Sequence, residues 1–337
     1  MHVESEFAPL RSVVLAQSQF CLPDKFDEAD TTFLTEENAR LTQNNEGRDL
    51  ADFAPEQQVR WEKEKEVMQG VLESYGVEVF RPRLLTTYEK EHGKELGVGY
   101  SNFFSRDPFF TIGNLLIEGN LRFQHRRQEI LPIRPIIQQW TQEAEGYYFA
   151  APQPDTSEGI LSEAGPFIEG GDVLVLGKTI FVGYSGLASN LAGIQWLANM
   201  IGHFGYEVVP VRLHPHILHL DCALSLLRDG LMIVCEEAFL DGLPAQLANW
   251  GKIHVTLEEA AYLVTNGLPL NEETYITDQS FTTLIPQIEA KGIKVEAIDY
   301  HVSRMLGGSF RCTTQALIRD RKSTRLNSSH NVLSRMP

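Results

Sequence analysis

Hydrophobic and polar residues alternate in a unit that recurs along this chain. Five segments share an amphipathic stretch, a glycine and a short run rich in Val, Ile, Tyr and Phe. A glycine just beyond a helix readily takes positive φ, and alternating β-branched and aromatic residues favour a strand. The pattern therefore predicts a helix followed by a strand at ESYGVEVFRP, EAEGYYFAAP, HFGYEVVPVRL, NWGKIHVTL and EAKGIKVEAID, whose glycines are Gly76, Gly146, Gly205, Gly251 and Gly292.

Other segments predict pairs of strands ahead of those helices. DVLVLGKTIFVGY, DCALSLLRDGLMIVC and PFFTIGNLLIEGN each read as two short strands joined by a glycine-containing turn. The resulting unit of strand, strand, helix and strand recurs about every 40 to 45 residues, a period typical of propeller blades and solenoids. Five units, the first beginning at PLRSVVLAQ and completed by the final hairpin LGGSFRCTTQALI, predict an α/β fold, a five-bladed α/β propeller with pseudo-fivefold symmetry. Two separate α/β domains are the alternative.

Two stretches fall outside the repeat. Residues from about 21 to 58 form a polar, acidic insert between the first strand and the first helix, which we expect to act as a lid. Residues 320–337, DRKSTRLNSSHNVLSRMP, are basic, rich in Ser and Asn, and resemble a translated sequencing adapter. We therefore expect residues 1–319 to form a single domain and the last stretch to be a non-native tail.

Composition narrows the classes of function. The 337 residues carry a formal net charge of −16 and show no basic stripe, which argues against nucleic-acid binding. No apolar run is long enough for a membrane span and the start lacks a signal-peptide pattern, so we expect a cytoplasmic protein that does not bind membranes. The four cysteines have no CxxC spacing, so neither a zinc knuckle nor a disulfide framework is indicated.

Several polar residues occupy equivalent places in the predicted units, at or just before the first strand of each. Equivalent positions in a ring of repeats converge on its axis, so these side chains are predicted to line one central pocket. Taken singly, each has a structural explanation: a lone cysteine is more often a small buried hydrophobe, and an aspartate before proline is often a turn residue. The residues are Asp107, Glu169, Asp172, His219, Asp221 and Cys312.

A metal site formed by the histidines near His219 is not expected. His214, His216, His219 and Cys222 cluster in the sequence, but if LHLDC is a strand, its alternation puts His219 and Asp221 on one face and Cys222 on the other.

The joint pattern resembles the guanidine-modifying superfamily, which includes arginine deiminases, dimethylarginine dimethylaminohydrolases, agmatine deiminases and amidinotransferases. The motifs are SRDP with Asp107, FIEGGD with Glu169, HLD with His219 and Asp221, and LGGSFRC with Cys312. The resemblance implies a five-bladed α/β propeller (pentein), a small guanidino substrate, and no metal or organic cofactor.

The resemblance also implies roles for these residues. Asp107 and Asp221 would clamp the planar guanidinium, because carboxylates accept its N–H donors in pairs. Cys312 would attack the guanidinium carbon, with its thiolate favoured by the substrate's charge and a protonated His219, and His219 would protonate the departing amine. Glu169 would orient His219, and Asp172 would secure the turn or contact substrate. The cations that could hold a substrate carboxylate are Arg122, Arg126, Arg127 and Arg311.

Two reactions share the resulting amidino-thiouronium intermediate. Water would make the protein a hydrolase, like the deiminases and dimethylargininases, whereas an acceptor amine would make it an amidinotransferase. The glutamate of EGGD resembles the hydrolases and favours that reaction, whereas GGSFRCTT resembles the transferases' cysteine loop, with Arg311 where they commonly carry histidine. A non-catalytic sensor of guanidino compounds is the third hypothesis, and a homo-oligomer is left open.

Overall fold

The computed structural model describes residues 2–26, 28–143, 146–157, 159 and 162–320. The sequencing-adapter-like stretch lies outside the described residues apart from Asp320, whose backbone N–H donates to Pro9 O at 3.3 Å. No helix in the described part of the chain is both long enough and apolar enough to cross a bilayer.

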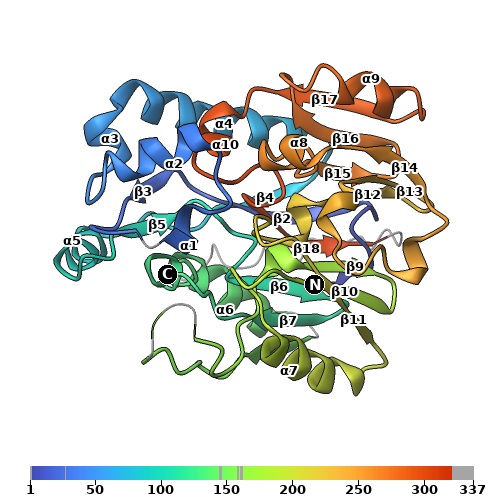
Figure 1. The fold of residues 1–337 in the computed structure, drawn as a ribbon, viewed down its shortest axis with the longest axis horizontal. Coiled ribbons are helices and arrows are strands. Elements are labelled where there is room, and N and C mark those ends of the chain that lie inside the picture. Colours follow the sequence, from blue (N-terminus) through green and yellow to red (C-terminus); the bar gives the residue numbers. More distant parts are fainter. Residues whose placement is uncertain (1, 27, 144–145, 158, 160–161, 321–337) are drawn as a thin grey trace, which may run out of the picture.

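Five sheets in the described chain repeat one arrangement, an antiparallel pair followed by a parallel strand (Figure 1). The predicted hairpins are confirmed at β6–β7, β9–β10 and β12–β13. Four of these sheets have three strands each: β6 (Phe109–Ile112), β7 (Leu115–Glu118) and β8 (Tyr147–Ala150); β9 (Val173–Leu176), β10 (Thr179–Tyr184) and β11 (Glu207–Arg212); β12 (Leu224–Arg228), β13 (Leu231–Val234) and β14 (Gly251–His254); β15 (Leu268–Asn271), β16 (Thr274–Asp278) and β17 (Lys294–Ile298).

The remaining sheet of this kind joins the two ends of the described chain. The last strand lies between two of the first strands, antiparallel to β2, as the sequence predicted for the final hairpin. All six residues of this last strand are buried. The sheet comprises β1 (His2–Val3), β18 (Thr314–Arg319), β2 (Leu10–Leu15) and β4 (Glu78–Phe80).

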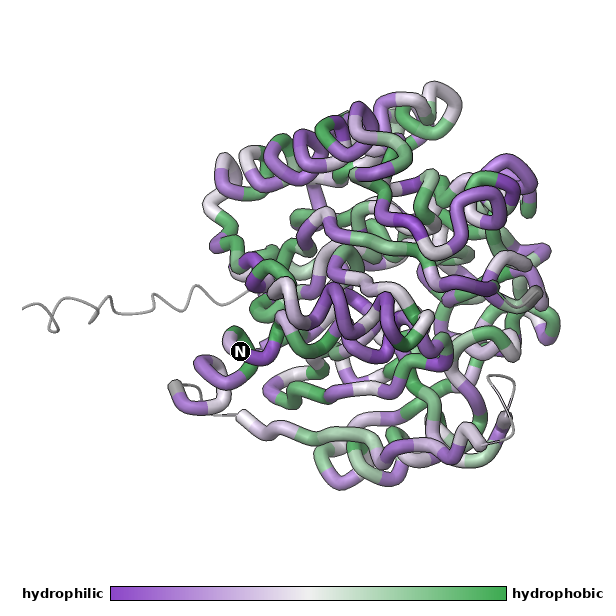
Figure 2. The backbone as a smooth tube through the Cα atoms, turned by 90° about the vertical axis from the view of Figure 1, so that its left-hand side faces the viewer, coloured by the Kyte–Doolittle hydropathy of each residue, from purple (hydrophilic) through white to green (hydrophobic). Residues whose placement is uncertain are grey.

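The longer helices lie outside the sheets (Figure 1), and hydrophilic and hydrophobic residues are interleaved along them (Figure 2). The longest, α4 (Pro55–Ser74), begins with proline at its first turn and buries Trp61, Met68 and Leu72 on one face. It ends at Ser74, two residues before Gly76, where φ is 74°, and φ is likewise positive at Gly205 and Gly292, as predicted. The other helices that precede the third strand of a unit are α6 (Arg134–Glu143), α7 (Leu191–Gly202) and α9 (Leu284–Glu289).

One predicted helix is wrong. Between β13 and β14 the described chain forms two short 3-10 turns, Glu236–Ala238 and Ala245–Leu247. Gly242 and Pro244 lie between these turns, and proline removes a helical N–H and clashes with the preceding turn. Gly251 is therefore the first residue of β14 rather than a residue that ends a helix.

The insert folds against one side of the sheets (Figure 1). It contains α1 (Glu28–Thr31), α2 (Glu36–Gln43) and α3 (Leu50–Phe53), and it ends where α4 begins at Pro55. A small antiparallel sheet of β3 (Gln19–Cys21) and β5 (Tyr100–Asn102) ties its start to the body of the protein. The described chain also contains α5 (Thr87–Glu95), α8 (Leu257–Ala261) and α10 (His301–Met305).

Candidate active site

Two 3-10 turns, Gly170–Asp172 and Leu220–Cys222, lie side by side at the starts of β9 and β12. Glu169 and His219 immediately precede these turns, so both side chains leave the backbone beside the same space. The expectation that LHLDC is a strand is therefore wrong. Asp172 contributes to this geometry, because its Oδ1 accepts the backbone N–H of Leu220 at 3.0 Å.

The paired glycines of EGGD are required by close packing. A Cβ on Gly171 would lie 2.6 Å from His219 Nδ1 and 2.7 Å from Asp107 Oδ1, and a Cβ on Gly170 would meet the carbonyl oxygen of Arg106. Contacts this short force a neighbour to move, so only residues without a Cβ let the turn approach the histidine. The N–H of Gly171 donates to Asp107 Oδ1 at 3.0 Å, which fixes that carboxylate.

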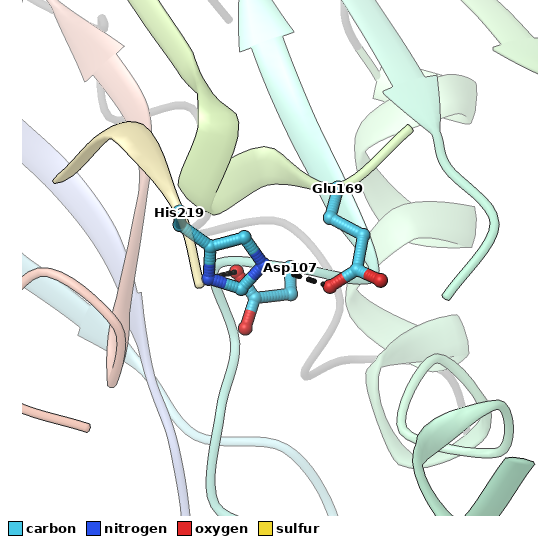
Figure 3. A group of neighbouring side chains, drawn as sticks. All are labelled: Asp107, Glu169 and His219. Carbon is cyan, nitrogen blue, oxygen red and sulfur yellow. Dashed lines mark hydrogen bonds and ion pairs between the residues drawn. The ribbon is translucent and has the colours of Figure 1, made fainter. Parts of the chain in front are cut away.

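His219 lies between two carboxylates (Figure 3). Its Nε2 is 2.9 Å from Glu169 Oε2, and its Nδ1 is 3.9 Å from Asp107 Oδ1. Burial acts to lower the pKa of His219, but Asp107, Glu169 and Asp172 outweigh it and raise that pKa to about 10. The imidazole is therefore a protonated, hydrogen-bonded cation at neutral pH and can donate a proton.

Arg126 joins the same group from a segment that follows β7. Its Nη2 donates to Asp107 Oδ2 at 2.6 Å and to Glu129 Oε2 at 2.8 Å, and its Nη1 is 3.9 Å from Glu169 Oε2. Burial acts to raise the pKa of Asp107, but His219 and Arg126 lower it overall, so this carboxylate is ionised. Arg126 thus contacts a residue proposed to bind the guanidinium.

Cys312 lies beside Asp221. Its Sγ is 4.0 Å from Asp221 Oδ2, and the same oxygen accepts from Arg311 Nη1 at 2.8 Å. Burial, followed by the charges of Asp221 and Asp107, raises the pKa of the thiol well above its usual value. Cys312 is therefore a thiol, not a thiolate, in these surroundings, and the lower pKa expected for the nucleophile requires added positive charge.

Glu6 is a buried partner that the sequence did not reveal. Its two carboxylate oxygens each accept from Arg311 at 3.1 Å, and although burial acts to raise its pKa, Arg311 and Arg106 lower it to about 2. The bidentate pair orients the Arg311 guanidinium toward Asp221. Glu6 could not be predicted as a site residue, because it belongs to no recognisable motif and its partner Arg311 is distant in the sequence.

Other expected site residues make contacts away from the cysteine. Asp172 is fully buried, accepts N–H groups of Leu220 and Ser189, and has a pKa raised to about 7 by burial. The Arg122 guanidinium donates to Glu163 Oε1 at 2.9 Å and Ala188 O at 3.0 Å, while its backbone N–H donates to Glu169. Arg127 donates to backbone oxygens of Leu121 and Arg122. Substrate contact by Asp172 or Arg122 stays a prediction.

Asp107, Glu169 and His219 also form the one group of potential metal ligands found among the described residues. A histidine ligates metals through a neutral ring nitrogen, whereas the surrounding carboxylates favour the imidazolium of His219. Arg126 already brings positive charge to two of the three residues. This arrangement favours proton donation over metal binding. His214 and His216 do not belong to the group.

A family model described as "N,N dimethylarginine dimethylhydrolase, eukaryotic" matches residues 33–319. The chain belongs to this family. Membership in the dimethylarginine dimethylhydrolase family confirms the resemblance to the guanidine-modifying superfamily and places the chain among enzymes that act on guanidino groups.

Individual proteins that this chain resembles include two amidinotransferases and an uncharacterized protein. Inosamine-phosphate amidinotransferase 1 of Streptomyces griseus is 24% identical, with 96% of this chain and 98% of that protein covered. The uncharacterized protein YkgA of Bacillus subtilis is 31% identical, but the match spans only 45% of this chain and 52% of that protein. The structure of SxtG, an amidinotransferase from Microseira wollei, has a TM-score of 0.77 at 21% identity and covers 96% of this chain and 98% of its own. This likeness shows a shared mixed α/β fold.

Proposed function

We propose that this protein cleaves a C–N bond of a guanidino compound through a covalent intermediate on Cys312 and acts as a hydrolase. The observation that carries the proposal is the gathering of three buried carboxylates, one imidazolium and one thiol around a single position. Asp107 lies beside His219, Asp221 lies beside Cys312, and the charges of both aspartates act on the thiol. A planar cation with several N–H donors matches such an arrangement.

The first half of the reaction forms the intermediate. The guanidinium binds between Asp107 and Asp221, and its positive charge lowers the pKa of the nearby thiol, which releases its proton to solvent water. The thiolate sulfur bonds to the guanidinium carbon. His219 then gives its proton to the departing nitrogen, the C–N bond breaks, and an amidino-thiouronium remains on Cys312.

The second half releases the product. His219 is now neutral and accepts a proton from water as the water oxygen bonds to the amidino carbon. The C–S bond breaks as the hydroxyl proton of the adduct passes to the leaving sulfur, the ureido product leaves, and the Cys312 thiol and the His219 imidazolium are restored. Glu169 holds Nε2 of the histidine throughout, at the 2.9 Å contact described above. This scheme uses no metal ion or organic cofactor.

Amidino transfer is the second candidate. The relative from Streptomyces griseus that matches over nearly its whole length is an amidinotransferase, as is SxtG. An acceptor amine would replace water in the second half, with His219 accepting the amine's proton. Following ammonia, ureido product and new guanidine, with and without glycine or another amine, separates the candidates. Product that forms only with the amine would reverse our preference.

We also propose that the five sheets close into a propeller ring around this group and that the insert acts as its lid. Contacts between neighbouring sheets support closure, because β18 lies against β6, β2 against β15, and β15 against β12. The two turns that follow Glu169 and His219 bring the sheets of β9 and β12 together.

Intact-mass spectrometry tests the covalent step. The protein is incubated with arginine, dimethylarginine and agmatine in turn and quenched in acid. We expect an added amidino group with at least one compound, absent in Cys312→Ser and retained in Cys235→Ala, whose buried sulfur lies at the end of β13. If no compound gives an adduct or turnover, and a cooperative unfolding transition shows that the protein was folded, the proposed mechanism is wrong.

A further inference from the structure

A cavity of about 50 Å³ lies between the insert and the body of the protein. Its walls are mostly apolar and include six phenylalanines. Phe33 of the insert stacks on Phe123 at 6.0 Å between ring centroids, and Phe26 packs edge-on to His125 at 5.8 Å. The lining phenylalanines come from both sides of the cavity: Phe20, Phe26, Phe33, Phe103, Phe104 and Phe123.

The cavity borders the candidate active site in three places. Arg126 lines it and bonds to Asp107. Leu218, which immediately precedes His219, forms part of its wall. Phe103 and Phe104 belong to the same apolar cluster as Cys312. A substituent on a guanidinium bound beside Asp107 would therefore enter this cavity as it leaves the reacting carbon.

The charges in the cavity oppose a carboxylate. Among the described residues that line it, Arg126 is the only lysine or arginine, and its guanidinium is engaged by Asp107 and by both oxygens of Glu129. Burial, with Arg126 nearby, lowers the pKa of His125 to about 3, so its ring is neutral. The carboxylate of Asp30 also lines the cavity and lies 3.9 Å from that ring.

A second cavity adjoins the first, and the described residues that line it supply no free cation that could pair with a substrate carboxylate. It shares Phe33, Leu218 and Gly307 with the first and includes Arg304. Arg304 Nε donates to Asp278 Oδ2 at 3.0 Å, and its Nη2 donates to Ser280 at 3.1 Å. An incoming carboxylate would have to break an existing pair or remain buried beside aromatic rings, and burying an unpaired charge is costly.

We infer that the substrate is an alkylguanidine whose far end carries no carboxylate, in contrast to an α-amino acid such as arginine. This inference rests on the proposed action on guanidines and narrows the substrate class. A hydrocarbon chain loses no hydrogen bonds on entering an aromatic pocket, so the cavity selects it over a carboxylate-bearing chain.

Arginine, agmatine and n-pentylguanidine separate the effect of the carboxylate from that of the amine. Agmatine is arginine without its carboxylate, and n-pentylguanidine replaces the amine of agmatine with a methyl group. Binding of each to Cys312→Ser is measured by calorimetry, and kcat/KM of the unmodified protein is measured in parallel. We expect agmatine and n-pentylguanidine each to bind at least about tenfold more tightly than arginine, a difference of about 1.4 kcal/mol.

The outcomes separate the two proposals. Arginine binding as tightly as agmatine, or more tightly, overturns the inference whether or not turnover occurs, and binding of none of the three overturns it as well. Preferential binding of the carboxylate-free ligands supports the inference even if no covalent adduct forms, in which case the proposed reaction alone fails.

A variant tests the cavity itself. Phe33→Ala removes an insert ring from the wall and should weaken binding of n-pentylguanidine severalfold more than binding of methylguanidine, which is too short to reach it. Val59→Ala is the control, since Val59 is 67% exposed on α4. Phe26→Ala serves as a second variant if Phe33→Ala lowers the unfolding temperature markedly. Equal weakening for both ligands in a folded variant would contradict the assignment of this cavity.

Discussion

At the scale of single residues, the surroundings of Cys312 and His219 have opposite effects on ionisation. Burial and two carboxylates hold the thiol in its neutral form, whereas three carboxylates hold the histidine as a cation. The proposed general acid is thus protonated before substrate binds, whereas the proposed nucleophile is not yet ionised. The missing positive charge is the one that a guanidinium substrate brings, so the site becomes reactive only toward molecules of that charge.

The raised pKa of Cys312 predicts slow alkylation at neutral pH. Only the thiolate reacts with iodoacetamide, so without substrate the rate at pH 7 should be low and should rise about tenfold per pH unit up to at least pH 9. Mass spectrometry of the labelled peptide gives this rate, with Cys312→Ser as the control. A rate that is already independent of pH between 7 and 9 would mean that the thiolate is stable without a guanidinium.

The contact between Gly171 and His219 predicts a large effect from one methyl group. Gly171→Ala should displace the imidazole or Asp107 and lower kcat by about 100-fold, a loss typical of a displacement of about 1 Å in catalytic groups. Gly70→Ala is the matched control, because nothing lies within 4 Å of a Cβ there, and it should stabilise α4 by about 1 kcal/mol. Steady-state kinetics that leave Gly171→Ala fully active would exclude the tight packing described.

At the scale of elements, α4 holds α10 in place beneath the cysteine loop. Glu64 accepts the backbone N–H groups of Val302 and Ser303 at 2.6 and 3.0 Å, and Lys65 donates to Ser303 Oγ at 2.5 Å. The short α10 leads directly into the glycines that precede Cys312. The position of the proposed nucleophile thus depends on a helix that belongs to the first repeat.

Glu64→Ala should therefore destabilise the protein. Two buried N–H groups would lose their acceptor, at a cost of about 3 kcal/mol in the free energy of unfolding. Urea unfolding measures this change. Glu62→Ala removes a carboxylate from the exposed side of the same helix and should change stability by less than about 0.5 kcal/mol. If both variants changed the free energy of unfolding by similarly small amounts, the hydrogen bonds from Val302 and Ser303 to Glu64 would contribute little to stability.

The elements also show where the sequence was informative. Hairpins were predictable because their turns contain glycine between alternating apolar runs, as at Gly177 between β9 and β10. The 3-10 turn at Leu220–Cys222 was not, because the apparent alternation of LHLDC is overridden by the tertiary bond from Leu220 to Asp172. A local pattern cannot reveal a partner that lies far away in the sequence.

The candidate site follows the same rule. The order of SRDP, FIEGGD, HLD and LGGSFRC indicated the residues that the structure brings together. The sequence did not indicate that Arg126 would bond to Asp107 or that Glu6 would hold Arg311, because a charged residue finds its partner only after the sheets assemble. The aromatic cavity was equally hidden, since its walls come from the insert and the body.

At the scale of the whole molecule, the first sheet is completed by the last described strand. β18 lies between β1 and β2, and Arg319 donates to Ala8 O at 2.9 Å and to Pro269 O at 2.6 Å. The residues just after Cys312 therefore hold distant parts of the chain together.

Two truncations test this closure. A chain that ends at Asp320 lacks only the tail that resembles a sequencing adapter, and it should keep the activity and unfolding temperature of the full chain. A chain that ends at Thr313 loses β18 and should not unfold cooperatively, as judged by circular dichroism and calorimetry. Native-like unfolding of the shorter chain would contradict the structural role of β18, and lost activity of the longer one would contradict the view of the tail as non-native.

The place of β18 also bears on how the protein is made. The N-terminus of a nascent chain leaves the ribosome first. β1 and β2 therefore leave the exit tunnel long before the strand that must insert between them has been translated. The first sheet cannot be completed until β18 has been translated, and Cys312 lies just ahead of that strand in the sequence. The proposed nucleophile and the strand that completes the sheet thus arrive together, and a nascent chain that stops short of Cys312 lacks the thiol on which the proposed reaction depends.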